Sequence, residues 1–199
     1  MTTALRQFTL FAVTLVALFN VSSVSAEVRM ETVMVPMRDG MRLTTDIYRD
    51  DAIKSAPVAL MRTPYNKERA KAVAERFAAA GYVAVVQDNR GKFASEGTFF
   101  PYDNEGQDGF DAVEWISKQT WCGGRIGMWG SSYVGATQWQ AAVEHPPGLT
   151  TITPTATFSS FYPPLSRSLI IATTISMTGI CHEPGGHRDV AEWRLGQVH

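Results

Sequence analysis

Residues 123–135 place a serine among small residues where an apolar run ends, and this pattern could make the serine a nucleophile. The segment has the composition of a short strand, a sharp turn and the start of a helix, which is the layout of a nucleophile elbow. A serine hydroxyl attacks well only when a turn presents it to a base and to backbone donors. Gly130 and Gly135 supply the room that so tight a turn requires.

The register of the turn selects Ser132 as the candidate nucleophile. Ser132 follows Gly130 after one intervening residue, as an elbow requires, and Gly135 comes one position later than in the common G-x-S-x-G pattern. The segment therefore fits G-x-S-Y-x-G, a narrower variant. The alternative interpretation is that Ser132 is only a small residue in a tight connection between strand and helix.

Two further polar segments, residues 62–67 and residues 88–97, each follow a predicted strand. The carboxyl ends of parallel strands meet at one edge of a sheet, so both segments are expected beside the elbow. We interpret Asp88 and Arg90 as charges that brace their loop, with a catalytic carboxylate at Asp88 as the alternative. The simplest interpretation of the cations at the ends of the first segment is solvation; these are Arg62 and Lys67.

Strands and helices alternate after an opening hairpin, which predicts an α/β fold with a mostly parallel sheet and helices on both faces. The expected strands are residues 30–37, 41–48, 57–62, 82–86, 125–129 and 149–154. The expected helices are residues 68–80, 104–118 and 133–144. Asp39-Gly40 indicates the hairpin turn, and Asn104 with Gln107 resembles a capping box. Core positions are expected for Trp115, Trp129 and Trp139, and a capping position at a helix end for His145.

These motifs, taken in order, resemble the X-Pro dipeptidyl-peptidase and cocaine-esterase family, which includes α-amino-acid ester hydrolases and acylases for β-lactam side chains. The resemblance covers about residues 33–164. It is carried by R-x-P-Y-x-K at 62–67, D-x-R-G-x-x-x-S-x-G at 88–97 and G-x-S-Y-x-G at 130–135, with Arg38-Asp39-Gly40 and Trp121-Cys122-x-Gly124-Arg125. It implies an α/β-hydrolase fold.

The resemblance also implies a role for three residues. Ser132 would form the acyl-enzyme, while the backbone N–H of Tyr133 and the hydroxyl of Tyr65 would stabilise the oxyanion. Without the resemblance, Tyr65 would be interpreted as an amphipathic rim residue. The implied substrate is a small ester, an amide or an X-Pro peptide, and the reaction implies no cofactor and no metal.

The acid and the histidine of a serine hydrolase would follow the serine in the chain, but only 67 residues follow Ser132. We therefore expect a domain truncated after the elbow region, with residues 27–160 as its N-terminal part and residues 161–199 as the start of a helical cap or an aberrant, disordered tail. Such a sheet would expose a parallel edge.

The alternative function is an inactive fragment that acts as a binding or partner-dependent remnant. The weaker tail candidates are Asp189 with His199, or His182 and His187, the last two also lacking companions for a metal site.

The beginning of the chain and its bulk composition bear on location and partners. Residues 1–26 have the charge, apolar run and small residues of a secretory signal peptide cleaved after Ala26, with an uncleaved anchor as the alternative. A periplasmic or secreted protein without a stable membrane span is expected after cleavage.

The net charge of −1 argues against a nucleic-acid partner. Cys122 and Cys181 form either one bridge or two free thiols, and the oligomeric state stays open.

Overall fold

The computed structural model describes residues 27–158, 169–170 and 175–176. The strands are β1 (Val28–Pro36), β2 (Arg42–Asp50), β3 (Ala56–Thr63), β4 (Val83–Asp88), β5 (Cys122–Ser131), β6 (Leu149–Thr155), β7 (Thr157–Phe158), β8 (Leu169–Ile170) and β9 (Ile175–Ser176). The helices are η1 (Lys67–Ala70, 3-10), α2 (Lys71–Ala79), α3 (Glu105–Ser117) and α4 (Tyr133–Val143). The six predicted strands and three predicted helices are confirmed, with shifted ends.

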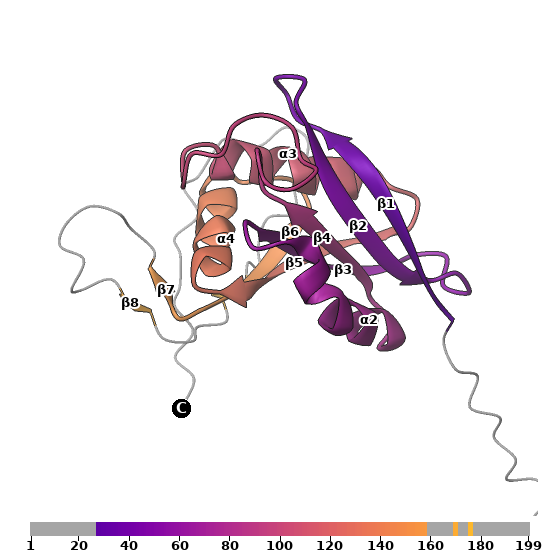
Figure 1. Ribbon diagram of the computed structural model, residues 1–199. Helices are drawn as coiled ribbons and strands as arrows, with labels where there is room; N and C mark the ends of the chain where they lie inside the picture. Colours follow the sequence, from indigo (N-terminus) through magenta and orange to yellow (C-terminus); the bar gives the residue numbers. More distant parts are fainter. Residues whose placement is uncertain (1–26, 159–168, 171–174, 177–199) are drawn as a thin grey trace, which may run out of the picture.

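The main sheet has the strand order β1-β2-β4-β3-β5-β6-β9 (Figure 1). The neighbours among β4, β3, β5 and β6 run parallel, whereas the β1–β2 hairpin and its junction with β4 are antiparallel. The expectation that β6 presents a bare edge is wrong at Thr151 and Ile152, because β9 returns to the sheet and pairs with them in antiparallel register. The mostly parallel α/β sheet that the alternation predicted is confirmed.

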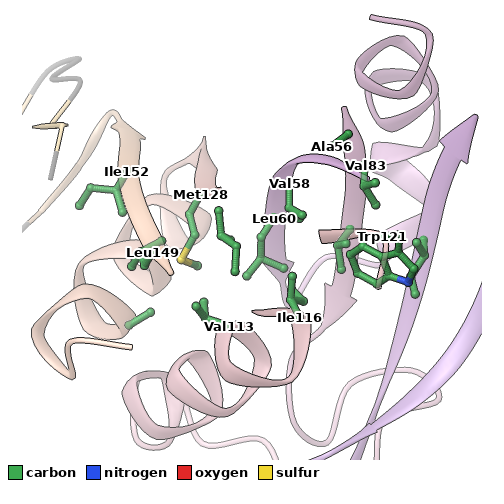
Figure 2. Packing of buried hydrophobic residues seen from close by; sticks show 14 of the residues in the cluster. Ala56, Val58, Leu60, Val83, Val113, Ile116, Trp121, Met128, Leu149 and Ile152 are labelled. Atoms are coloured by element: carbon green, nitrogen blue, oxygen red, sulfur yellow. The ribbon is translucent and has the colours of Figure 1, made fainter. Parts of the chain in front are cut away.

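Helices cover both faces of this sheet. The helices α3 and α4 pack side by side on one face, and α2 packs on the other, against β2 and β4 (Figure 1). β4 shows the consequence, since Val83 and Val85 join the core beneath α3 and α4 while Ala84 and Val86 join the core beneath α2. Figure 2 shows the larger core, in which side chains of β3, β5 and β6 meet those of α3.

Of the two local signals predicted at helix ends, the one at His145 is confirmed and the capping box at Asn104 is wrong. His145 follows α4 with φ 53°, and its amide donates to the carbonyl of Ala142 at 3.0 Å, so it occupies the helix end as predicted. The capping box is wrong, because the Asn104 side chain makes no capping hydrogen bond to α3. The acidic residues Glu105 and Asp108 in the first turn complement the helix dipole instead.

The predicted core tryptophans pack against the two hydrophobic clusters, Trp115 and Trp139 against one and Trp129 against the other. Within the described residues, no helix has the length and apolar character needed to cross a membrane. The predicted signal peptide, and all of residues 161–199 except β8 and β9, lie outside the described residues. The predictions for these segments therefore stay predictions, as does a bridge between Cys122 and Cys181.

Candidate active site

The connection from β5 to α4 is a strained turn centred on Ser132. Ser132 has φ 58° and ψ −126°, a conformation that residues other than glycine rarely adopt. Its amide donates to the carbonyl of Thr155 at 2.9 Å, and its own carbonyl accepts from the amides of Gly135 and Ala136 at 2.9 and 3.1 Å. Ser132 is exposed, so the turn holds a serine rigidly and presents it to solvent.

The two glycines of the elbow are required by contact, as the sequence predicted. A Cβ on Gly130, which has φ 134°, would lie 2.3 Å from Cγ1 of Val134. A Cβ on Gly135 would lie 2.6 Å from Cγ2 of Thr157. Neither position can hold a side chain unless the side chain of Val134 or Thr157 shifts.

The candidate oxyanion donors lie at the same edge of the sheet. Tyr133 is the first residue of α4, so its amide has no acceptor within the helix and lies at the positive end of the helix dipole. Tyr65 lies on the turn after β3 with 49% of its surface exposed. The Tyr65 ring meets the Tyr133 ring edge-on, with 6.4 Å between the centroids. The structure thus brings together the three residues singled out in the sequence.

The turn that carries Tyr65 is held by short local bonds. The amide of Tyr65 donates to Oγ1 of Thr63 at 3.0 Å, and Asn66, with φ 79°, accepts from the amide of Glu68 at 3.0 Å. Tyr65 and Ser131 line one hollow of about 300 Å³ beside the elbow. A larger hollow of about 420 Å³ is lined mainly by β3, β5 and β6, and neither Tyr65 nor Ser131 lines it.

Among the described residues, no histidine lies close enough to act as the base for Ser132. His145 is the one histidine among residues 27–158, and it follows the far end of α4. With 11 residues in the helix, at about 1.5 Å per residue, that end lies about 16 Å from the elbow. The other candidates, His182, His187 and His199 with Asp189, lie outside the described residues. The described residues also contain no group of three or more side chains suited to hold a metal ion.

The interpretation of Arg62 as a solvated cation is wrong. β3 is a central strand between β4 and β5, and the Arg62 side chain near its end is fully buried. Its Nη1 donates to the carbonyl of Glu105 at 2.7 Å, and its Nε donates to Oε1 of Gln87 at 2.9 Å. Ion pairs with Glu105 at 3.2 Å and Asp108 at 3.7 Å balance its charge.

Lys67 is not solvated either. Its Nζ donates to Oδ2 of Asp46 at 2.8 Å, and its amide donates to Oδ1 of Asp88 at 2.7 Å. These two bonds tie the turn bearing Tyr65 to β2 and β4. Both partners are buried, so the lysine is held where the sequence alone suggested a free side chain.

Asp88 and Arg90 have structural roles, as predicted, although the Asp88 carboxylate braces the Tyr65 turn and not its own loop. Arg90 pairs with Asp108 of α3 and with Asp39 of the hairpin turn, both at 2.6 Å, and the hydrogen bond that its guanidinium donates to Asp108 raises the pKa of the guanidinium. Asp88 is fully buried beneath the Tyr65 turn, which favours the structural interpretation over a catalytic carboxylate. Burial raises the pKa of the Asp88 carboxyl to about 6, although the amide and the charge of Lys67 act to lower it.

The raised pKa of Asp88 predicts a pH-dependent contribution to stability. The folded protein binds the Asp88 proton more tightly than the unfolded chain, so this stabilisation is complete below about pH 4 and is lost as pH rises through about 6. The unfolding free energy of the wild type minus that of Asp88→Asn is expected to fall by about 2 to 3 kcal/mol over this range. Urea denaturation of both proteins between about pH 4 and pH 7 measures the difference. A difference that stays constant or rises with pH would contradict the assignment.

Glu105 is the residue at this site that the sequence did not reveal. This buried carboxylate of α3 accepts from Nδ2 of Asn89 at 2.7 Å and from the hydroxyl of Tyr133 at 2.8 Å, and it pairs with Arg62. Three separate segments therefore meet on one side chain. An acidic residue in the first turn of a helix is commonplace, so its type and position carry no signal of this role.

Known proteins with similar sequences belong to the family that the motifs resemble. A model of the X-Pro dipeptidyl-peptidase (S15) family matches residues 39–168. Cocaine esterase from Rhodococcus sp. (strain MB1 Bresler) is 47% identical over 136 residues, which cover 65% of this chain and 24% of that protein.

Solved structures show the same likeness. An α-amino acid ester hydrolase superposes with a TM-score of 0.61 and 30% identity, over 70% of this chain and 27% of that one. An aminopeptidase from a marine sediment Thaumarchaeota archaeon superposes with a TM-score of 0.60 and 27% identity, over 67% and 26%. The α/β-hydrolase fold is thereby confirmed. The chain spans about a quarter of the length of these relatives.

Proposed function

Because the chain belongs to the X-Pro dipeptidyl-peptidase (S15) family, we propose that it carries the nucleophile and both oxyanion donors of a secreted serine hydrolase. The observation that carries the proposal is the exposed Ser132, held at φ 58° between β5 and α4 beside Tyr65. Such a turn is costly for a serine, and strain of this kind persists where function uses it.

The proposed reaction forms and then hydrolyses an acyl-enzyme. The Ser132 oxygen attacks the substrate carbonyl carbon while a base takes the hydroxyl proton, and the N–H of Tyr133 and the hydroxyl of Tyr65 donate to the resulting oxyanion. The carbon–leaving-group bond then breaks, the leaving alcohol or amine receives the proton, and water releases the acid by the same steps. The base and its orienting acid come from outside the described residues.

The substrate class is a small ester, an amide or an X-Pro peptide. Ester hydrolysis is the first candidate, because the relative at 47% identity is a cocaine esterase and one structural relative is an α-amino acid ester hydrolase. Peptide hydrolysis is the second, supported by the family model and by the related aminopeptidase. The proposed chemistry requires neither a cofactor nor a nucleic-acid partner, and residues 1–26 would direct the protein to the periplasm or the medium.

A fluorophosphonate probe tests the proposal on the protein expressed from its own gene and recovered from periplasm or medium. Mass spectrometry of the intact product gives its size, and peptide mapping identifies the labelled residue. We expect the adduct on Ser132, and we expect Ser131→Ala, the matched change one residue away, to keep it. A folded product without an adduct would support the alternative of a binding or partner-dependent remnant.

The proposed role of Tyr65 as an oxyanion donor predicts a loss of kcat when its hydroxyl is removed. Tyr65→Phe keeps the ring that contacts Tyr133 but removes the hydroxyl donor, so kcat for an ester substrate is expected to fall about 100- to 1000-fold. KM is expected to change little, because the bond forms chiefly in the transition state. Steady-state kinetics of both proteins measure the two constants. An unchanged kcat would remove Tyr65 from the oxyanion site.

A further inference from the structure

We propose that Glu105 is a positioning residue for the oxyanion site, acting through the phenol of Tyr133; this inference rests on the proposed function. The carboxylate touches neither the elbow backbone nor the hollow beside it. It binds the hydroxyl at the far end of the Tyr133 side chain, and the backbone amide of Tyr133 is the candidate donor.

The hydrogen-bond pattern fixes the direction of the phenol proton. The amide of Tyr102 donates to the Tyr133 hydroxyl oxygen at 2.9 Å, so that oxygen already acts as an acceptor. The hydroxyl hydrogen is therefore directed to Oε1 of Glu105 at 2.8 Å. Burial, followed by the charge of Glu105, raises the pKa of the Tyr133 phenol well above its usual range, so the proton stays on the phenol.

Every polar group that faces the Glu105 carboxylate is a donor. Asn89 approaches Oε1 through its amide nitrogen at 2.7 Å, Tyr133 through its hydroxyl, and Arg62 approaches Oε2 through a guanidinium nitrogen at 3.2 Å. Oε1 accepts both hydrogen bonds, and Oε2 makes the ion pair with Arg62 without a hydrogen-bond partner among the described residues. Glutamine at this position keeps the shape but replaces one of the two oxygens by an NH2 group and removes the charge, so its N–H hydrogens face donors whichever way the amide is turned.

The Tyr133 ring connects this carboxylate to both oxyanion donors. Tyr102 stacks on the ring with 4.3 Å between centroids, and Phe99 packs against it at 6.0 Å. The Tyr65 ring rests edge-on against it. Loss of the bond to Glu105 would free the Tyr133 ring to move, and with it the packing at the first residue of α4 and the support of the Tyr65 ring.

The test measures how fast the protein expressed from its own gene reacts with a fluorophosphonate, separating the maximal rate kinact from the half-saturating concentration KI. We expect Glu105→Gln and Tyr133→Phe each to lower kinact by about 10- to 100-fold, with KI within about twofold, because misplaced donors weaken the transition state more than binding. The double variant is expected to be no slower than the slower single variant, because the two changes act through the same bond between Tyr133 and Glu105, which can be lost only once.

A control in the same helix separates positioning from general stability. Glu114→Gln removes a carboxylate of α3 that pairs with Lys118 at the surface, and it is expected to leave kinact unchanged. Reaction rates are taken well below each thermal midpoint, and Tyr133→Phe carries the test if Glu105→Gln does not fold. A kinact for the single variants within threefold of wild type (about 0.7 kcal/mol), or losses that multiply in the double variant, would overturn the inference. Absence of labelling in the wild type would instead overturn the proposed function.

Discussion

Replacing Ser132 by alanine is expected to lower kcat for an ester substrate about a millionfold, the largest effect of any single change in this chain. The substitution removes the only oxygen that the elbow presents for attack at that position, so no acyl-enzyme forms there. The oxyanion donors remain, and the residual rate is expected to exceed that in water by about 1000- to 10,000-fold. Steady-state turnover and fluorophosphonate labelling measure both consequences.

Ser131→Ala is the control for this prediction, because Ser131 is the exposed neighbour on the same turn. It ends β5 instead of occupying the strained position, and its loss is expected to change kcat by less than about tenfold. Ser132→Ala that retains more than about 1% of wild-type turnover would contradict the assignment of the nucleophile. Reversed effects of the two changes would move the nucleophile to Ser131.

Replacing Arg62 by methionine is expected to lower the free energy of unfolding by about 3 to 5 kcal/mol. The change keeps a long side chain in the core but leaves the carboxylates of Glu105 and Asp108 buried without this partner. It also removes the donor to Gln87. Urea denaturation at neutral pH measures the loss as a shift in the midpoint at constant slope.

Arg42→Met is the matched control for that stability change. Arg42 pairs with Glu96 at 2.6 Å, but its side chain is 59% exposed, so solvent screens the pair and the expected loss is much smaller than for Arg62→Met. Similar losses for the two variants would show that burial of the Arg62 network does not govern its contribution. A loss below about 1 kcal/mol for Arg62→Met would show that the buried charges find water or other partners.

The order of elements and the elbow were readable in the sequence because both depend on local pattern. Valine-rich β4 between helical stretches predicts a buried parallel strand, and Asp39-Gly40 predicts the hairpin turn that the structure contains. The spacing of Gly130, Ser132 and Gly135 likewise implies a turn with no room for larger residues. Steric limits act over a few residues, so the residues themselves reveal them.

The charged residues behind the site were not readable in the same way. Arg62 and Lys67 look like surface cations, and Asn104 looks like a helix cap, yet the first two are held by buried carboxylates and the third caps nothing with its side chain. Whether a charge is solvated depends on what covers its strand. That covering comes from helices distant in the sequence.

The sequence by itself determined the α/β order, the nucleophile candidate and the resemblance that assigns Tyr65 and Tyr133, because each rests on neighbouring residues or on motif spacing. Only the tertiary structure decided that Glu105 gathers Arg62, Asn89 and Tyr133. Those partners are 43, 16 and 28 residues away along the chain. A hydrogen bond depends on the positions of two atoms after folding, and residue type and sequence distance do not specify those positions.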